Sequence, residues 1–162
     1  MARLVAADNA SFLELVPVPT ARGRDESLSL RVAFEAWGEP VEGVAAMTRE
    51  GAARLVERIR QFCARQAGML QLRNEEQTLE LNLAAKRSKW TSKLRVTGLS
   101  NVPETADPNL PEETRVSLGI TYRQEGSHNG APASVEHRAG MVCTFEALDR
   151  FATELAAETT AA

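Results

Sequence analysis

The stretch from Thr48 to Cys63, TREGAARLVERIRQFC, carries the clearest structural signal in the sequence. Its apolar residues recur at the spacing of one helical face, at Ala52, Leu55, Val56, Ile59, Phe62 and Cys63. Thr48 is suited to the N-cap, because its hydroxyl can accept a backbone N–H of the first turn. Glu50 complements the positive end of the helix dipole, and Gly68 is a suitable stop signal. The stretch therefore predicts an amphipathic helix that lies on a sheet.

A second stretch near the end of the chain has the same pattern. Met47-Thr48-x-Glu50 leads into the first helix, and Cys143-Thr144-x-Glu146 leads into a second one. The second helix has its apolar stripe at Phe145, Leu148, Phe151, Ala152 and Leu155. Any well-capped helix that follows a strand shares these features, so the similarity alone does not establish a repeat. The alternative is a quasi-repeat of two strand–helix halves, residues 11–67 and 68–157.

The segments around the two helices alternate between apolar and polar residues, as half-buried strands do. The predicted strands are residues 12–16, 28–34, 41–47, 69–73, 79–83, 90–97, 116–122 and 135–143. A turn is expected at 126–130, and a long proline-bearing loop at 101–114. Sequence neighbours joined by short turns pair antiparallel. We therefore expect an α+β fold in a single domain, 1–162, with one mostly antiparallel β-sheet covered by two amphipathic helices.

Length and charge restrict the class of partner. The 162 residues fit one domain with a self-sufficient core. The net charge of -3 and the pI near 5.5 argue against a nucleic-acid partner, because such proteins usually present a strongly basic surface. Nothing at the N-terminus resembles a signal peptide, and no apolar run approaches the roughly 18 residues of a membrane span. We expect a cytoplasmic protein that binds neither nucleic acid nor membrane.

Residues that carry catalysis or bind metals are few and scattered. His128, in a Gly/Asn-rich turn, and His137, on a strand, fit ordinary surface positions. Cys63 and Cys143 lie in apolar patterns and are expected to be buried free thiols, although a disulfide between them stays open. Cys143 and His137 are roughly 20 Å apart along one strand, too far for a nucleophilic pair. No zinc-ligand spacing or phosphate loop occurs. We expect no catalytic residue, no metal and no cofactor, and hence no enzyme.

Three features are candidates for partner binding. The segment Lys86–Arg95 concentrates positive charge around an aromatic residue and places Lys89, Lys93 and Arg95 on one strand face. It is either a solvated outer face or a patch for phosphate or an acidic surface. The loop that follows carries only negative charge, at Glu104, Asp107, Glu112 and Glu113. This loop is either a spacer or a docking site that steers a basic protein. Trp37, beside a turn, is either packed at the core edge or an interface residue.

The order of these patterns resembles the WapI-type immunity proteins of bacterial polymorphic-toxin systems and their uncharacterised relatives. The resemblance rests on residues 12–15, the strand 28–34, the helix 54–62, the segments 68–72 and 79–83, and the closing strand and helix around 144–155. It covers most of the chain and consists of apolar spacing, without a chemical signature. It implies a cytoplasmic protein that binds a cognate toxin domain tightly and blocks it.

The leading expectation is therefore a non-catalytic immunity protein that neutralises a bacterial toxin by direct protein–protein binding. Two alternatives from other classes stay open. One is a small-molecule or nucleotide-binding regulatory domain that uses Lys86–Arg95, which a thermal-shift screen would detect. The other is a structural or adaptor subunit of a phage-defence or secretion assembly. Self-association into a homodimer through an exposed strand edge would favour that alternative.

Overall fold

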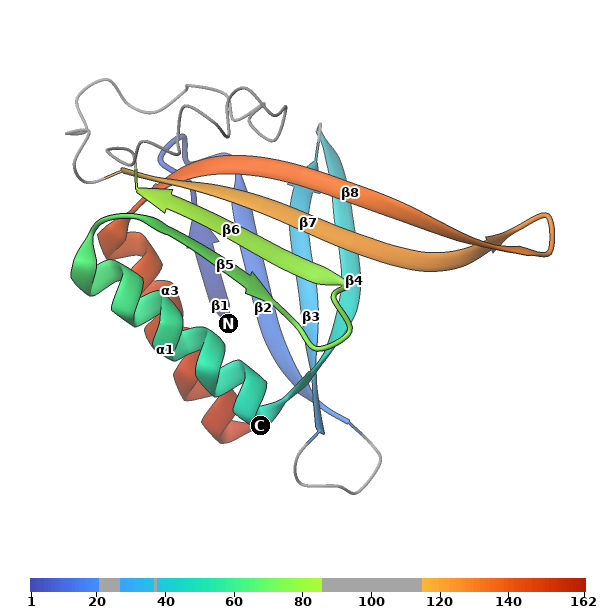
Figure 1. Ribbon diagram of the computed structural model, residues 1–162, viewed down its shortest axis with the longest axis horizontal. Helices are drawn as coiled ribbons and strands as arrows, with labels where there is room; N and C mark the ends of the chain where they lie inside the picture. The colour runs from blue at the N-terminus through green and yellow to red at the C-terminus, as the bar shows by residue number, and fades with distance from the viewer. Residues whose placement is uncertain (21–26, 37, 86–114) are drawn as a thin grey trace.

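The computed structural model describes residues 1–20, 27–36, 38–85 and 115–162. These residues form two four-stranded antiparallel sheets and two helices (Figure 1). The first sheet has the order β1 (Ala2–Val5), β2 (Phe12–Pro19), β3 (Ser27–Ala36) and β4 (Glu39–Thr48). The second has the order β5 (Met69–Arg73), β6 (Leu79–Ala85), β7 (Arg115–His128) and β8 (Ala131–Thr144). The last strand of each sheet leads directly into a 17-residue helix, α1 (Arg49–Arg65) or α3 (Phe145–Ala161).

The predicted α+β class and the antiparallel pairing are confirmed, but the strands form two sheets and not one. The first sheet ends at β4 because side chains occupy backbone groups along the free edge of that strand. The Tyr122 hydroxyl accepts from the N–H of Val44 at 3.1 Å and donates to its carbonyl at 3.3 Å. Farther along the edge, the Asn74 side chain donates to the carbonyl of Ala46 at 2.9 Å. The chain continues as α1, and the second sheet begins beside that helix.

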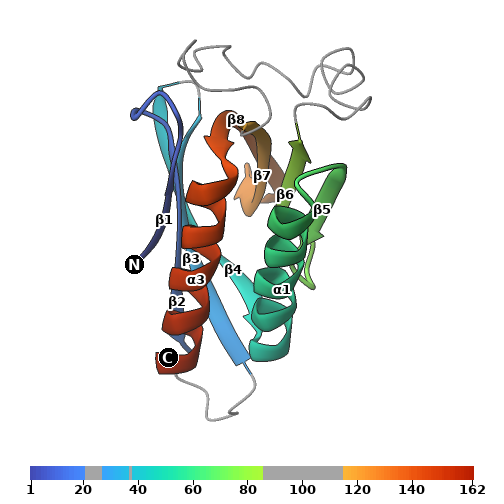
Figure 2. The same ribbon diagram turned by 90° about the vertical axis from the view of Figure 1, so that its left-hand side faces the viewer.

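The two helices lie side by side, and each one packs on strands of the other half of the chain (Figure 2). Helix α3 packs on β1 and β2, while α1 lies beside β5. A hydrogen bond of 3.0 Å from Arg49 Nη1 to the carbonyl of Thr159 joins the start of α1 to the end of α3. Consequently the buried apolar residues of both halves, among them Phe34, Ile59 and Phe151, form one core cluster.

The starts of the two helices are built alike. In each, the N-cap threonine hydroxyl accepts a backbone N–H of the first turn, Thr48 from Gly51 at 2.9 Å and Thr144 from Ala147 at 3.1 Å. In each, the first-turn glutamate pairs with the arginine four residues on, Glu50 with Arg54 and Glu146 with Arg150. The order of four strands and a helix occurs twice. The first half includes β1, which was not among the predicted strands, because four residues are too short for a clear alternation.

The hairpin of β7 and β8 differs from the prediction. Residues 126–128, expected in a turn, are paired strand residues, and the register continues to His128 opposite Ala131. Only Asn129 and Gly130 make the turn, with φ values of 52° and 78°. An Asn-Gly pair with positive φ at both residues closes a two-residue hairpin without any further turn residue. The predicted strand 90–97 lies outside the described residues.

Candidate interaction surface

The eight residues predicted to bind a partner lie outside the part of the chain that the structure describes. They are Trp37, Lys89, Lys93, Arg95, Glu104, Asp107, Glu112 and Glu113. The basic segment and the acidic loop therefore stay predictions. The described residues provide a different polar surface, on the outer side of the second sheet.

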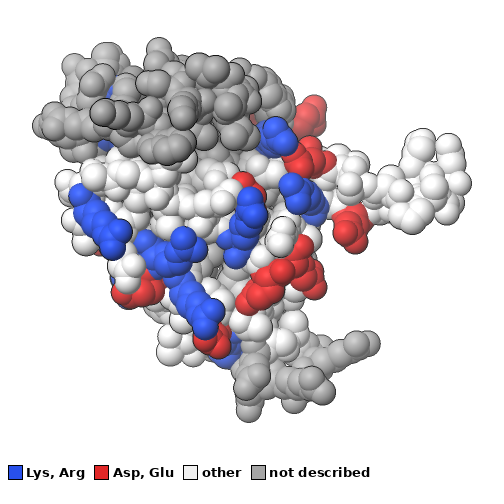
Figure 3. All heavy atoms as spheres, viewed as in Figure 1, with Lys and Arg blue, Asp and Glu red and all other residues white. Residues whose placement is uncertain are grey.

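The second sheet has one face in the core and one toward solvent. Its apolar positions, such as Leu81, Leu118 and Ile120, are buried. At one end of the sheet the outward row is mostly apolar, with Met69, Ala84, Ser117 and Val142. The remaining outward positions are polar residues or glycine, and we call this set the second-sheet face: Gln71, Arg73, Glu80, Asn82, Gly119, Thr121, Arg123, Glu136, Arg138 and Gly140. Figure 3 shows this side of the molecule, where positive and negative side chains are intermixed. The surface thus offers both charges and neutral hydrogen-bonding groups.

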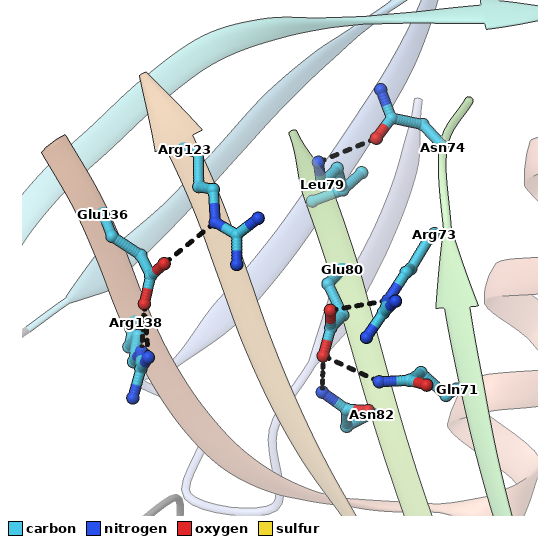
Figure 4. Close-up of polar contacts among 9 residues, drawn as sticks. All are labelled: Gln71, Arg73, Asn74, Leu79, Glu80, Asn82, Arg123, Glu136 and Arg138. Atoms are coloured by element: carbon cyan, nitrogen blue, oxygen red, sulfur yellow. Dashed lines mark hydrogen bonds and ion pairs between the residues drawn. The ribbon is translucent and has the colours of Figure 1, made fainter. Parts of the chain in front are cut away.

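Glu80 is the centre of the first polar cluster on this face (Figure 4). Its carboxylate accepts hydrogen bonds from Arg73 Nε at 2.8 Å, Gln71 Nε2 at 3.0 Å and Asn82 Nδ2 at 2.7 Å. Partial burial raises the pKa of Glu80, but the hydrogen bonds from Asn82 and Gln71 and the nearby Arg73 lower it more, so that the pKa lies below its usual value. The carboxylate is therefore ionised near neutral pH and held in one orientation.

Glu136 is the centre of the second cluster, on the neighbouring strands β7 and β8 (Figure 4). Arg123 Nε donates to its carboxylate at 2.9 Å, and Arg138 donates to the other carboxylate oxygen. These two hydrogen bonds lower the pKa of Glu136 below its usual value. The arginine side chains keep about half of their surface exposed, 48% for Arg123 and 58% for Arg138. Their remaining N–H groups are thus open to a partner.

Two glycines make the middle of the face flat. Gly119 and Gly140 are directly paired across β7 and β8, and Asn82 is the register partner of Gly119 on β6. A Cβ placed at Gly119 would lie 3.8 Å from the Cβ of Asn82, an ordinary contact distance. No described neighbour therefore requires glycine at this position. The missing side chain leaves the strand backbone close to the surface, where another molecule can approach it.

Beyond the body of the molecule, β7 and β8 continue as a two-stranded projection, which we call the arm, residues 123–136 (Figure 1). Strand β6 pairs with β7 up to Tyr122, and the N–H of Arg123 still bonds the carbonyl of Thr78 at 2.8 Å. Beyond this point no described strand pairs with the arm. The end of the arm, residues 126–135, carries no Asp, Glu, Lys or Arg. It is the white projection in Figure 3. Two strands without further support are only marginally stable in water, which makes the arm a candidate contact region.

The two cysteines belong to the core and not to the second-sheet face. Cys63 and Cys143 are free, buried thiols, as expected. Burial and the nearby Asp149 raise the pKa of Cys63 to about 11, and burial with the neighbouring Cys63 raises the pKa of Cys143 to about 12. Both thiols are therefore protonated at neutral pH and are poor nucleophiles. Among the described residues, no group of three or more His, Cys, Asp or Glu side chains is placed to hold a metal ion.

Comparisons with protein-family models, with curated proteins and with solved structures give no match. Within the described residues, neither helix has the length and apolar character that crossing a membrane requires.

The second-sheet face was not predicted as a site. Among residues 136–138, the sequence predicts a strand-surface position for His137 alone, and it does not indicate which residues lie beside Glu136 and Arg138 on other strands. The outward polar positions of β5 and β6 do follow from alternation. The polar clusters around Glu80 and Glu136 can be recognised only when the strand register is known, for example the register that places Arg123 opposite Glu136.

Proposed function

We propose that this chain is a non-catalytic binding protein and that the second-sheet face recognises another protein. The observation that carries the proposal is the arrangement of two fixed, ionised carboxylates, Glu80 and Glu136, beside the flat Gly119–Gly140 pair. Charged groups that are held in place before binding lose little conformational freedom on association. They also select a partner of complementary charge and accelerate its approach.

A macromolecule suits this surface better than a small molecule does. Small ligands are usually bound in concave, largely apolar pockets. The second-sheet face is instead the outer side of a sheet, with polar side chains from all four strands. An interface between proteins typically combines such polar groups with shape complementarity over a broad area.

More specifically, we propose that this chain is an immunity protein that binds a cognate bacterial toxin in the cytoplasm. It is supported by the resemblance to WapI-type immunity proteins and by a face on which arginines and carboxylates alternate. Fixed charges of this kind allow the rapid and selective capture that inhibition of a toxin requires.

Co-expression with the product of an adjacent gene, followed by purification through a tag on this chain, tests the proposal. We expect a stable stoichiometric complex with the wild-type chain and its loss with Gly119→Arg, which places a long side chain on the flat centre of the face. Ala53→Arg is the control, because it places the same long side chain at an exposed position of α1, away from the second-sheet face and from the arm. If no adjacent gene product co-purifies, or if Gly119→Arg binds as well as Ala53→Arg, the proposal is wrong.

A further inference from the structure

Strand β8 has a free edge whose backbone groups can be assigned. It is the last strand of the second sheet, and the carbonyl of Val142 accepts the N–H of Ala7 at 2.8 Å on the side away from β7. In an antiparallel pair the residues alternate between those that bond the neighbouring strand and those that face outward. The backbone groups of Val142 point away from β7, so the N–H and carbonyl groups of the other even-numbered residues of β8 also point away from β7, except that Pro132 has no N–H. The hairpin turn gives the same assignment. Ala131 pairs with His128 to close the turn, so the backbone groups of this odd-numbered residue must bond β7.

The outward groups between Ser134 and Gly140 have no hydrogen-bond partner among the described residues. The edge strand of the first sheet is different, because Tyr122 and Asn74 occupy the outward groups of Val44 and Ala46 on β4. Proteins usually cover or block a free strand edge, since it can pair with another chain. Because the backbone groups of this stretch of β8 have no bond within the described chain, another strand can add here.

The sequence of this edge is complementary to itself. Glu136 and Arg138 flank His137, and the backbone N–H and carbonyl groups of both residues point away from β7. In an antiparallel pair of two β8 strands centred on His137, Glu136 of each copy lies opposite Arg138 of the other. A pairing centred on Glu136 or on Arg138 brings two like charges together, which is unfavourable. Only the register centred on His137 matches opposite charges and also pairs outward residues with outward residues.

The same register ends where the backbone stops being available. It places Pro132 of one copy opposite Val142 of the other. Pro132 has no N–H to donate, and the carbonyl of Val142 is already bonded to Ala7. The pairing therefore runs from Ser134 to Gly140 in each copy, which is the stretch of β8 without a partner in the described chain.

From this complementarity we propose that a second copy of this chain pairs antiparallel with β8, in a two-fold symmetric dimer centred on His137. The partner strand extends each four-stranded sheet into one continuous sheet across both copies. Residues 134–136, at the base of each arm, lie along residues 138–140 of the other copy and gain a third strand there. An isologous contact of this kind is the commonest way in which identical chains associate. This inference is independent of the function proposed above, because it needs no other protein.

Charge reversal tests the register. In a dimer of the Glu136→Arg variant, the new arginine at position 136 lies opposite Arg138 of the other copy, so two positive charges meet. In a dimer of the Arg138→Glu variant, Glu136 lies opposite the new glutamate at position 138, so two negative charges meet. We expect sedimentation equilibrium to show a dimer for the wild type and weaker self-association for either variant by at least tenfold in the dissociation constant. An equimolar mixture should form a heterodimer, because every arginine then opposes a glutamate. A monomeric wild type, or a mixture that associates no better than the separate variants, would overturn the proposal.

A backbone test uses Ser134→Pro, which removes an outward N–H two residues from the natural Pro132. The substitution leaves the bonds to β7 intact, so the circular dichroism spectrum should not change. We expect the proline variant to be monomeric and the control variant Ser134→Ala to remain a dimer. A folded Ser134→Pro variant that dimerises like wild type would show that β8 does not pair through its edge.

Discussion

Replacing Gly43 by alanine tests how the two sheets are held together. Gly43 lies on β4, and a Cβ there would be 2.1 Å from the hydroxyl oxygen of Tyr122 and 2.3 Å from the ring carbon that bears it. The ring of Tyr122 is buried in the core, and its hydroxyl bonds the N–H and the carbonyl of Val44. Tyr122 cannot make room for a methyl group without leaving its place in the core and losing these hydrogen bonds.

The expected cost follows from these two effects. Forcing an extra methyl group into a packed core costs about 1–3 kcal/mol. Each hydrogen bond that is lost contributes about 0.5–1.5 kcal/mol, although the exposed Val44 lets water replace part of it. We therefore expect Gly43→Ala to lower the free energy of unfolding by about 2–4 kcal/mol. Tyr122→Phe loses only the hydrogen bonds and should cost about 1 kcal/mol.

Urea unfolding followed by circular dichroism measures these differences. Gly119→Ala is the matched control, because its Cβ would meet only Asn82 at 3.8 Å, and we expect a change within about 0.5 kcal/mol. In a Tyr122→Leu background the further cost of Gly43→Ala should largely disappear, since the ring that blocks the methyl group is gone. Equal stabilities of Gly43→Ala and Gly119→Ala would refute the packing of Tyr122 against β4.

Three further predictions concern the rest of the fold. The carboxylate of Glu75 accepts hydrogen bonds from the side chain and the backbone of Thr48, at 2.7 Å and 3.3 Å. Partial burial raises the pKa of Glu75, but these hydrogen bonds lower the pKa more, so that it lies below its usual value. Glu75→Gln should therefore be less stable than wild type at neutral pH, and the difference in urea midpoint should shrink as the pH falls from 4.5 toward the lowered folded-state pKa; an unchanged difference at acid pH would contradict this. Thr144→Ala removes the N-cap of α3 and should cost about 1 kcal/mol in the same assay, whereas Thr144→Ser should restore most of it; equal losses for both variants would exclude the capping role. The thiols of Cys63 and Cys143, with pKa values raised to about 11 and about 12, should not react with a disulfide reagent at pH 8 until the chain unfolds; rapid reaction of the native chain would show that they are accessible.

The elements that carry strong periodicity were predictable from the sequence. The helix from Arg49 to Arg65 follows from its apolar stripe, and its cap follows from Thr48. The alternation from Leu28 to Phe34 likewise predicted the core face of β3. These signals are local, because each depends on residues within one or two turns or within one strand.

The number of sheets and the polar clusters were not predictable in the same way, because they depend on pairs of residues far apart in the chain. Tyr122 reads as one more apolar strand position, and nothing local indicates that its hydroxyl bonds β4. The arm was shortened in the prediction because Gly126 and Ser127 are typical turn residues. In the structure, Asn129 and Gly130 make the turn, and Gly126 and Ser127 remain paired with β8.

The central claim, that the second-sheet face binds a protein partner, is tested most directly by titrating the isotopically labelled chain with its purified partner and following backbone amide signals. Glycine amides report conveniently, because this chain has them both on the face and away from it. We predict large shifts at Gly119 and Gly140 and none at Gly68, which follows α1. Unchanged signals at Gly119 and Gly140 in a saturated complex would contradict the claim.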